Sequence, residues 1–140
     1  RFMASFITNR GARDLSVETS GTQIDWSADT IKARLVPSSV TPTKDDTSMT
    51  GLTAIGTDPT LGSKTFTEDT TNDRIVYDAA DPTWTAVAGG STVGWCVVYK
   101  FVTNDAGSTP IFVIDLTDTP TNGGDITVQF ASTGIGYLQQ

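Results

Sequence analysis

The amino-acid sequence predicts an all-β fold, an antiparallel two-sheet sandwich of the jelly-roll type with about eight or nine strands. The chain of 140 residues holds 25 threonines but only 6 leucines and 2 glutamates, so it favours a β-branched residue over good helix formers. Turn-forming residues recur at short intervals and separate short apolar runs. Because these connections are too short for βαβ crossovers, the strands are expected to be antiparallel.

Several runs show the alternation of a strand with one buried face. In Thr30–Val36 the apolar residues alternate with Lys32 and Arg34. In Asp125–Phe130 they alternate with polar residues in the same way, as a sheet with one wet face requires. Shorter candidate strands are Thr65–Glu68, Arg74–Asp78, Trp84–Val87 and Gly134–Leu138.

Two further runs are apolar on both faces, Trp95–Val102 and Ile111–Leu116. Such strands either lie at the centre of a two-sheet core or cover a surface that meets another chain. The second alternative makes one face of the first run a candidate self-association surface, because closed symmetry is the usual outcome of self-pairing. The side chains of that candidate surface are Trp95, Val97, Tyr99 and Phe101.

Any helix is expected to be short, because no apolar pattern of helical spacing lasts beyond about three turns. The two candidate positions are Ser48–Ile55 and a single turn after Asp14. The stretch Ser38–Thr50 is rich in Thr, Ser and Pro and predicts a long exposed loop. The length of the chain fits one domain, which we place at residues 14–140, preceded by an arm.

The charge is acidic overall and uneven along the chain. Nine Lys and Arg against 16 Asp and Glu give −7, which repels phosphate backbones. The apolar runs are also far shorter than the roughly 20 residues of a membrane span, so neither nucleic acid nor a membrane is an expected partner. Residues 1–13 carry three arginines and no acid. They are a candidate docking arm for an acidic partner surface, unless the arginines lie by chance on a frayed terminus.

Side chains suited to catalysis or zinc binding are scarce. The chain has no histidine and one cysteine, which excludes zinc and the nucleophiles that depend on histidine. Cys96 lies in a run that is apolar on both sides and is predicted to be a small buried hydrophobe. The carboxylates lie mostly in turn contexts, where they bond to the backbone. We therefore expect no enzymatic activity, no metal and no other cofactor.

One acidic turn is the candidate site for a weakly bound structural calcium ion. Its residues are Glu68, Asp69, Asn72 and Asp73. Calcium requires several converging oxygen ligands, and the spacing of the usual calcium-binding loop is absent here. An exposed polar hairpin is the simpler interpretation of this turn.

Four stretches carry a resemblance to a known family. They are Asp29–Lys32, Ser63–Thr85, Gly94–Lys100 and Thr121–Phe130, which follow one another in a specific order. In these stretches the chain from Asp29 onward resembles a family of small virion proteins from tailed bacteriophages. The first 28 residues depart from the family pattern, so the resemblance does not indicate where a docking surface lies.

The resemblance implies a cement or decoration protein that binds the outside of an icosahedral capsid and stabilises it. It implies the major capsid protein and other copies of this chain as partners, with synthesis in the host cytoplasm and assembly on the capsid exterior. Such a protein needs contact area rather than catalytic chemistry, and the family supplies no active-site residue. The arm then offers apolar anchors and charge-assisted bonds to the shell. These capsid-contact candidates are Phe2, Phe6, Arg10 and Arg13.

Two other functions stay open at this point. A tail or fibre binding module would recognise a host surface glycan through an exposed aromatic side chain, for which Trp26 and Trp84 are the candidates. A glycan-cleaving enzyme would need two carboxylates across a cleft. Glu68 is the candidate for such a pair, although no carboxylate spacing supports it.

Overall fold

The computed structural model describes residues 5–16 and 22–139. Over these residues the chain forms nine strands and one short helix, and all strand pairs are antiparallel. The predicted all-β antiparallel fold is therefore confirmed. In chain order the elements are β1 (Phe6–Ile7), α1 (Asn9–Ser16), β2 (Ile31–Pro37), β3 (Thr65–Asp69), β4 (Arg74–Asp78), β5 (Thr83–Trp84), β6 (Thr92–Val102), β7 (Asn104–Pro120), β8 (Ile126–Thr127) and β9 (Gly136–Gln139).

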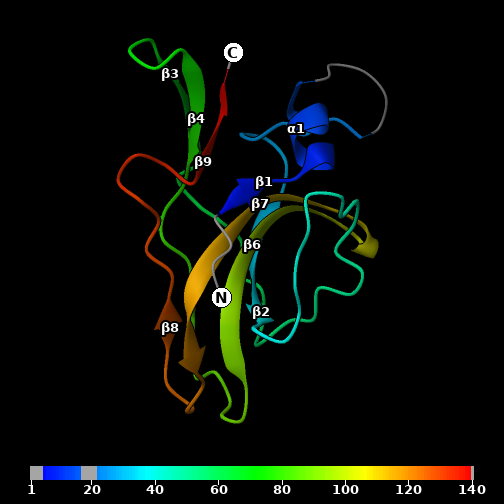
Figure 1. The fold of residues 1–140 in the computed structure, drawn as a ribbon, viewed down its shortest axis with the longest axis vertical. Helices are drawn as coiled ribbons and strands as arrows, with labels where there is room; N and C mark the ends of the chain where they lie inside the picture. The colour runs from blue at the N-terminus through cyan, green and yellow to red at the C-terminus, as the bar shows by residue number, and fades with distance from the viewer. Residues whose placement is uncertain (1–4, 17–21, 140) are drawn as a thin grey trace.

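The largest sheet has four strands in the order β1-β7-β6-β2 (Figure 1). Its centre is the long hairpin of β6 and β7, which closes where Val102 pairs with Asn104. Thr103 joins the two strands with a φ of 56°, the left-handed conformation found in tight turns. The run that is apolar on both faces, β6, therefore has a bonded neighbour on each edge.

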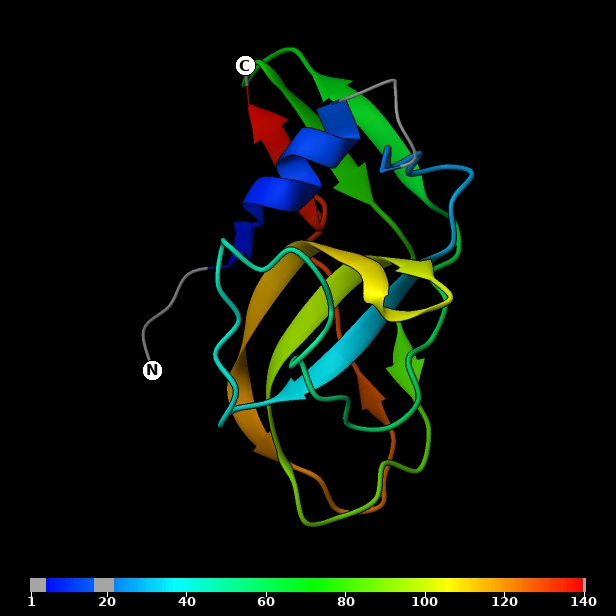
Figure 2. The same ribbon diagram turned by 90° about the vertical axis from the view of Figure 1, so that its right-hand side faces the viewer.

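Two smaller sheets accompany the main one, with strand orders β3-β4-β9 and β5-β8. The β3-β4-β9 sheet projects from the end of the main sheet, on the same side as α1 (Figures 1 and 2). Gly136 allows it to approach closely, because a Cβ added there would lie 2.4 Å from the ring of Phe112 on β7. The jelly-roll topology stays a prediction, since the described sheets contain four, three and two strands.

Both faces of the main sheet are covered, which produces two apolar clusters. One cluster lies between this sheet and the smaller sheets and includes Leu35, Cys96 and Phe112. The other cluster lies on the opposite face and includes Trp95 together with Met49. Met49 belongs to the long segment between β2 and β3, which crosses in front of the main sheet in Figure 2.

That same segment also lies along the edge of β2. Ser48–Ile55, one of the two predicted helices, contains turns instead and ends in a bridge from Ile55 to Leu35. The Ile55 amide donates to the carbonyl of Leu35 and the Leu61 amide to that of Ile31, both at 2.8 Å. The chain thus covers an edge that would otherwise present unpaired backbone groups.

The helix α1 begins earlier than the turn predicted after Asp14 and includes that residue. Thr8 caps its start, since the Gly11 amide donates to the Thr8 hydroxyl at 2.9 Å. A Cβ on Gly11 would lie 2.7 Å from the Cα of Ile111, so the helix rests directly on β7. The described part of the predicted arm, residues 5–13, therefore belongs to the folded body.

Candidate functional site

The residues predicted to contact a capsid lie on two different elements. Phe6 on β1 is half-buried and packs against the cluster that contains Trp95. Arg10 and Arg13 lie on α1, where Arg13 pairs with the buried carboxylate of Asp14 at 2.5 Å. The Arg13 side chain is still 51 % exposed. Phe2 lies outside the described residues.

The candidate self-association surface on β6 is buried inside the protein. Trp95, Val97 and Tyr99 are at most 2 % exposed, and Phe101 is half-buried beneath the ammonium of Lys32. The segment between β2 and β3 covers them. In this fold their apolar face is thus part of a second core, not a surface that meets another copy. The run is thus central to a core, as the first alternative expected, but a segment without a sheet, and not a second sheet, covers this face.

A charged cluster joins this covering segment to the main sheet. Its centre is Arg34 on β2, which is 6 % exposed. The guanidinium donates from Nε to Oδ2 of Asp58 at 2.7 Å and binds both carboxylate oxygens of Asp105 at 3.0 and 2.9 Å. It also donates to the carbonyl of Leu52 at 3.0 Å. The Tyr99 hydroxyl donates to Oδ2 of Asp58 at 2.7 Å. One cation therefore ties the covering segment to β2 and to the start of β7.

The environment of the cluster shifts the pKa values of Arg34, Tyr99 and Asp105. Burial opposes the charge of Arg34, but the hydrogen bonds to Asp105 and Asp58 outweigh burial and raise the pKa of the guanidinium. Burial, together with the bond to Asp58, raises the pKa of the Tyr99 hydroxyl. The bond from Arg34 lowers the pKa of Asp105. Arg34 and Tyr99 thus keep their protons near neutral pH, and the cluster acts as a structural clamp.

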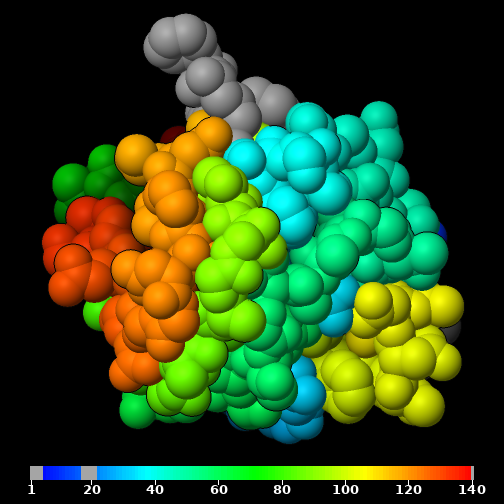
Figure 3. Space-filling model, turned by 90° about the horizontal axis from the view of Figure 1, so that it is seen from below, coloured from blue at the N-terminus to red at the C-terminus, as the bar shows by residue number. Residues whose placement is uncertain are grey.

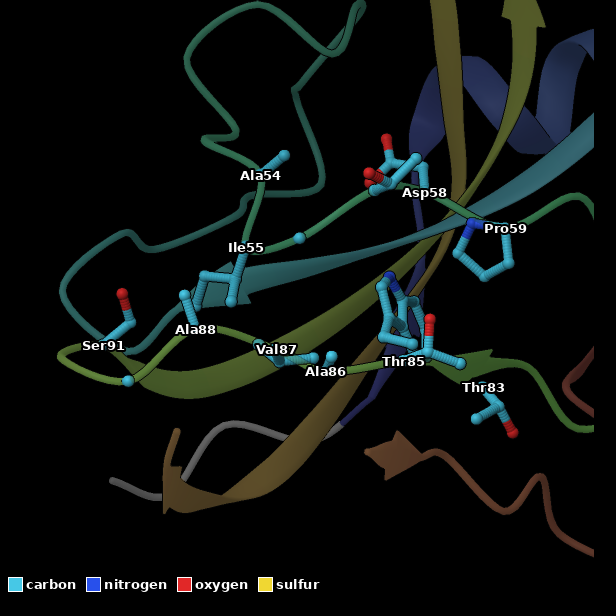
Figure 4. A pocket seen from close by; sticks show the side chains of 14 residues that line it. Ala54, Ile55, Asp58, Pro59, Thr83, Thr85, Ala86, Val87, Ala88 and Ser91 are labelled. Carbon is cyan, nitrogen blue, oxygen red and sulfur yellow. The ribbon is translucent and has the colours of Figure 1, made fainter. Parts of the chain in front are cut away.

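A pocket of about 580 Å³ lies beside the clamp (Figure 4). Two segments line it, one between residues 54 and 59 and the other between residues 83 and 91. Their atoms adjoin on the surface shown in Figure 3, as blue-green and light green. Ile55, Trp84 and Val87 are buried and form its apolar part. Its hydroxyl-bearing residues are Thr57, Thr83, Thr85 and Ser91.

Two buried polar atoms of pocket residues have no hydrogen-bond partner among the residues that the structure describes. They are Oδ1 of Asp58 and Nε1 of Trp84. An unsatisfied buried polar group of this kind costs about 1–3 kcal/mol. The other glycan candidate, Trp26, differs because it is buried and its Nε1 donates to the carbonyl of Asp78 at 3.3 Å. Both candidates are buried rather than exposed, and each lines a pocket, but of the two only Trp84 has an unpartnered indole N–H.

The acidic turn between β3 and β4 is built by its own side chains. Asp69 accepts hydrogen bonds from the side chains of Asn72 and Arg74, both at 2.8 Å, and these bonds lower the pKa of Asp69. Asp73 has a φ of 51°, as a turn position requires. Glu68 is exposed on β3. Within residues 5–16 and 22–139, no group of three or more acidic or thiol side chains is placed to hold a metal ion.

Cys96 is fully buried on β6, as its apolar context predicts. Burial raises the pKa of its thiol. A protonated and inaccessible thiol is a packing group rather than a nucleophile.

The clamp and the pocket are the features that sequence reasoning missed. The alternation in Thr30–Val36 predicts that Arg34 faces solvent, whereas the segment after β2 folds over that face. Asp58 precedes Pro59, and this turn context explains the carboxylate without a second role. The available signal was the apolar content of the covering segment, because Met49 and its neighbours have no reason to lie in an exposed loop.

Comparison of the chain with protein-family models, curated proteins and solved structures gives no significant match. Among the residues that the structure describes, no helix is long and apolar enough to cross a membrane. The function is therefore inferred from the sequence, the surface and the pocket.

Proposed function

We propose that this protein is a virion structural protein that binds the exterior of a tailed-bacteriophage capsid and stabilises it as a cement or decoration protein. The major capsid protein is then its partner, and the chain makes and breaks no covalent bond. The resemblance of the four sequence stretches supports the virion assignment. The net charge of −7 is compatible with the outside of a capsid, which does not face packaged DNA.

The observation that carries this proposal is a pair of exposed aromatic side chains on the β3-β4-β9 sheet. Phe66 on β3 is 56 % exposed and Tyr137 on β9 is 47 % exposed. They pair with Tyr77 and Val76, which are consecutive residues of β4, so the two aromatic rings lie on opposite faces of the sheet. Exposed aromatic residues are enriched in protein–protein interfaces. A projecting sheet with an aromatic ring on each face is suited to bridging two shell subunits.

The edge of this sheet supports the same docking face. Among the strands of residues 5–16 and 22–139, β3 pairs with β4 alone, and four of its five residues are exposed. An open strand edge can be extended by a strand of a binding partner. Glu68 and Asp69 on this edge carry negative charge, which discourages unspecific strand pairing. The docking surface that we propose is therefore the free edge of the β3-β4-β9 sheet together with Phe66 and Tyr137, which lie on its two faces.

Binding to capsids that lack this protein tests the proposal. The double variant Phe66→Ser with Tyr137→Ser is expected to bind at least about tenfold more weakly than the natural chain, because interface aromatics often contribute 2 kcal/mol or more. Val102→Ser is the matched control, since Val102 is 41 % exposed but lies on β6 away from this sheet. We expect the control to bind as the natural chain does.

Undiminished binding by the double variant would rule out this docking face. Arg10→Glu combined with Arg13→Glu then tests the alternative contact through α1, where both arginines lie. If no variant of either face affects binding, or if the natural chain does not bind the capsid at all, the proposal of a cement protein is wrong.

A further inference from the structure

We propose that the pocket between residues 54–59 and 83–91 binds a neutral saccharide, through hydroxyl groups that bond to Asp58 and Trp84. This site is separate from the sheet proposed to dock on a capsid. Neither inference depends on the other, and each has its own experiment.

The unpartnered atoms define the chemistry of the ligand. Oδ1 of Asp58 requires a donor, and Nε1 of Trp84 requires an acceptor. A hydroxyl group is both a donor and an acceptor, so a molecule with several hydroxyls offers a partner of the right kind to each atom. The threonine and serine hydroxyls that line the pocket can also donate or accept hydrogen bonds. Saccharides are the common ligands that present several adjacent hydroxyls beside apolar C–H faces.

The charge and the size of the pocket indicate which class of saccharide it would bind. Within the described part of the chain, Asp58 is its one charged lining residue, and no lysine or arginine lines it. Arg34 is bound to Asp58 and to Asp105, so the clamp as a whole carries one net negative charge. Phosphorylated or acidic sugars are therefore disfavoured. A volume of about 580 Å³ lies within the range of small-molecule sites and accommodates a monosaccharide or a disaccharide.

Two residues of the pocket wall have a left-handed backbone conformation. Gly56 has a φ of 76°, and a Cβ built on it would lie 3.5 Å from Cδ1 of Trp84, the atom next to Nε1. On the opposite wall, Ala86 has a φ of 48°, which is strained for a residue with a side chain. The Ala86 amide is held by the Asp125 carboxylate at 2.8 Å. Nε1 of Trp84 and Oδ1 of Asp58 are both buried, so the binding that we propose requires part of the pocket wall to move.

Nuclear magnetic resonance of the tryptophan indole N–H groups tests the proposal directly. The probes are glucose, galactose, mannose and N-acetylglucosamine at up to about 20 mM, because one small site is expected to bind a monosaccharide with a dissociation constant of about 1 mM. N-acetylneuraminic acid is the anionic counterpart. We expect at least one neutral probe to shift the Trp84 indole resonance saturably and more than that of Trp26. The anionic probe is expected to leave it in place.

Two matched variants separate a ligand contact from a packing role. Trp84→Phe and Trp26→Phe remove the same volume, but only Trp26 loses a hydrogen bond that exists without ligand. Trp84→Phe is expected to weaken binding of the responding sugar about fivefold to tenfold, the loss of one hydrogen bond. Trp26→Phe is expected to leave binding unchanged while lowering the unfolding temperature further.

Three results would overturn the proposal. One is that no neutral probe shifts the Trp84 resonance of the natural chain, a measurement that needs no variant to fold. The second is that all indole resonances shift alike, which indicates unspecific contact. The third is that Trp26→Phe weakens binding as much as Trp84→Phe does.

Discussion

The four-stranded sheet and the β3-β4-β9 sheet differ in how much of their surface the chain itself covers. The main sheet lies between two apolar clusters, and the segment that follows β2 lies along its edge. The smaller sheet packs one face against the core through Tyr77, while Phe66 and Tyr137 stay largely exposed. The contrast agrees with the proposed division of roles, in which the main sheet provides stability and the smaller sheet contacts the partner.

We expect the largest difference in stability between the two sheets when one arginine is removed from each. Arg34→Ala is expected to lower the free energy of unfolding by about 3–5 kcal/mol, because Asp58 would stay buried without its cation. Arg74→Ala is the matched change on the smaller sheet, where Arg74 pairs with a partly exposed Asp69 and stacks on Tyr137. We expect it to cost about 1 kcal/mol or less. Urea denaturation measures both, and equal losses would contradict the contrast.

A second comparison concerns the segment between β2 and β3, which covers one face of the main sheet. Met49 belongs to this segment, and it is fully buried in the apolar cluster that also contains Trp95 of β6. Met49→Ala is expected to destabilise the protein by about 2–4 kcal/mol, as for other core truncations. Thr67→Ala, at an exposed position of β3, is expected to change stability by less than about 0.5 kcal/mol. A loss below about 1 kcal/mol for Met49→Ala would show that this segment is not a true core layer.

The junction between the two sheets offers a smaller effect. Gly136→Ala places a methyl group 2.4 Å from the buried ring of Phe112, so one of the two sheets must shift. We expect a loss of about 1–3 kcal/mol, measured by thermal unfolding. Gly62→Ala is the control, because a Cβ there meets nothing within 4 Å. If both variants unfold at the same temperature, the sheets do not pack as closely as described.

The smallest effect is a pH dependence that belongs to the main sheet. The bond from Arg34 lowers the pKa of Asp105 in the folded protein. The ion pair of Asp105 therefore contributes its full stability above the pKa of about 4 that the carboxyl has in the unfolded chain. This stability is lost as the pH falls through the lower pKa of Asp105 in the folded protein. The Asp105 side chain is 51 % exposed, so the loss is expected to stay below about 1 kcal/mol. Asp105→Asn should flatten the stability profile below about pH 4, and an unchanged profile would contradict this assignment.

Local patterns were sufficient to predict most of the strands. The alternation in Thr30–Val36 and the short run Arg74–Asp78 correspond to β2 and β4 within about one residue. Burial of Cys96 also followed from its neighbours along the chain. These features depend on residues that are close in sequence, where side-chain direction and turn chemistry decide the structure.

Features that depend on distant residues could not be predicted in this way. Arg34 and Asp105 are 71 positions apart, and no local pattern indicates that they meet. The apolar residues on both faces of β6 indicate that both faces are buried. They do not indicate that Met49 covers one of them. The same holds for the pocket, because Asp58 and Trp84 come from two segments that only the fold brings together.

Electron cryo-microscopy of capsids incubated with the natural chain tests the central claim most directly. We expect density for this protein on the outer surface of the shell, with the β3-β4-β9 sheet against the shell subunits and both Phe66 and Tyr137 in contact. Bare capsids would contradict the claim, as would bound protein whose β3-β4-β9 sheet faces solvent.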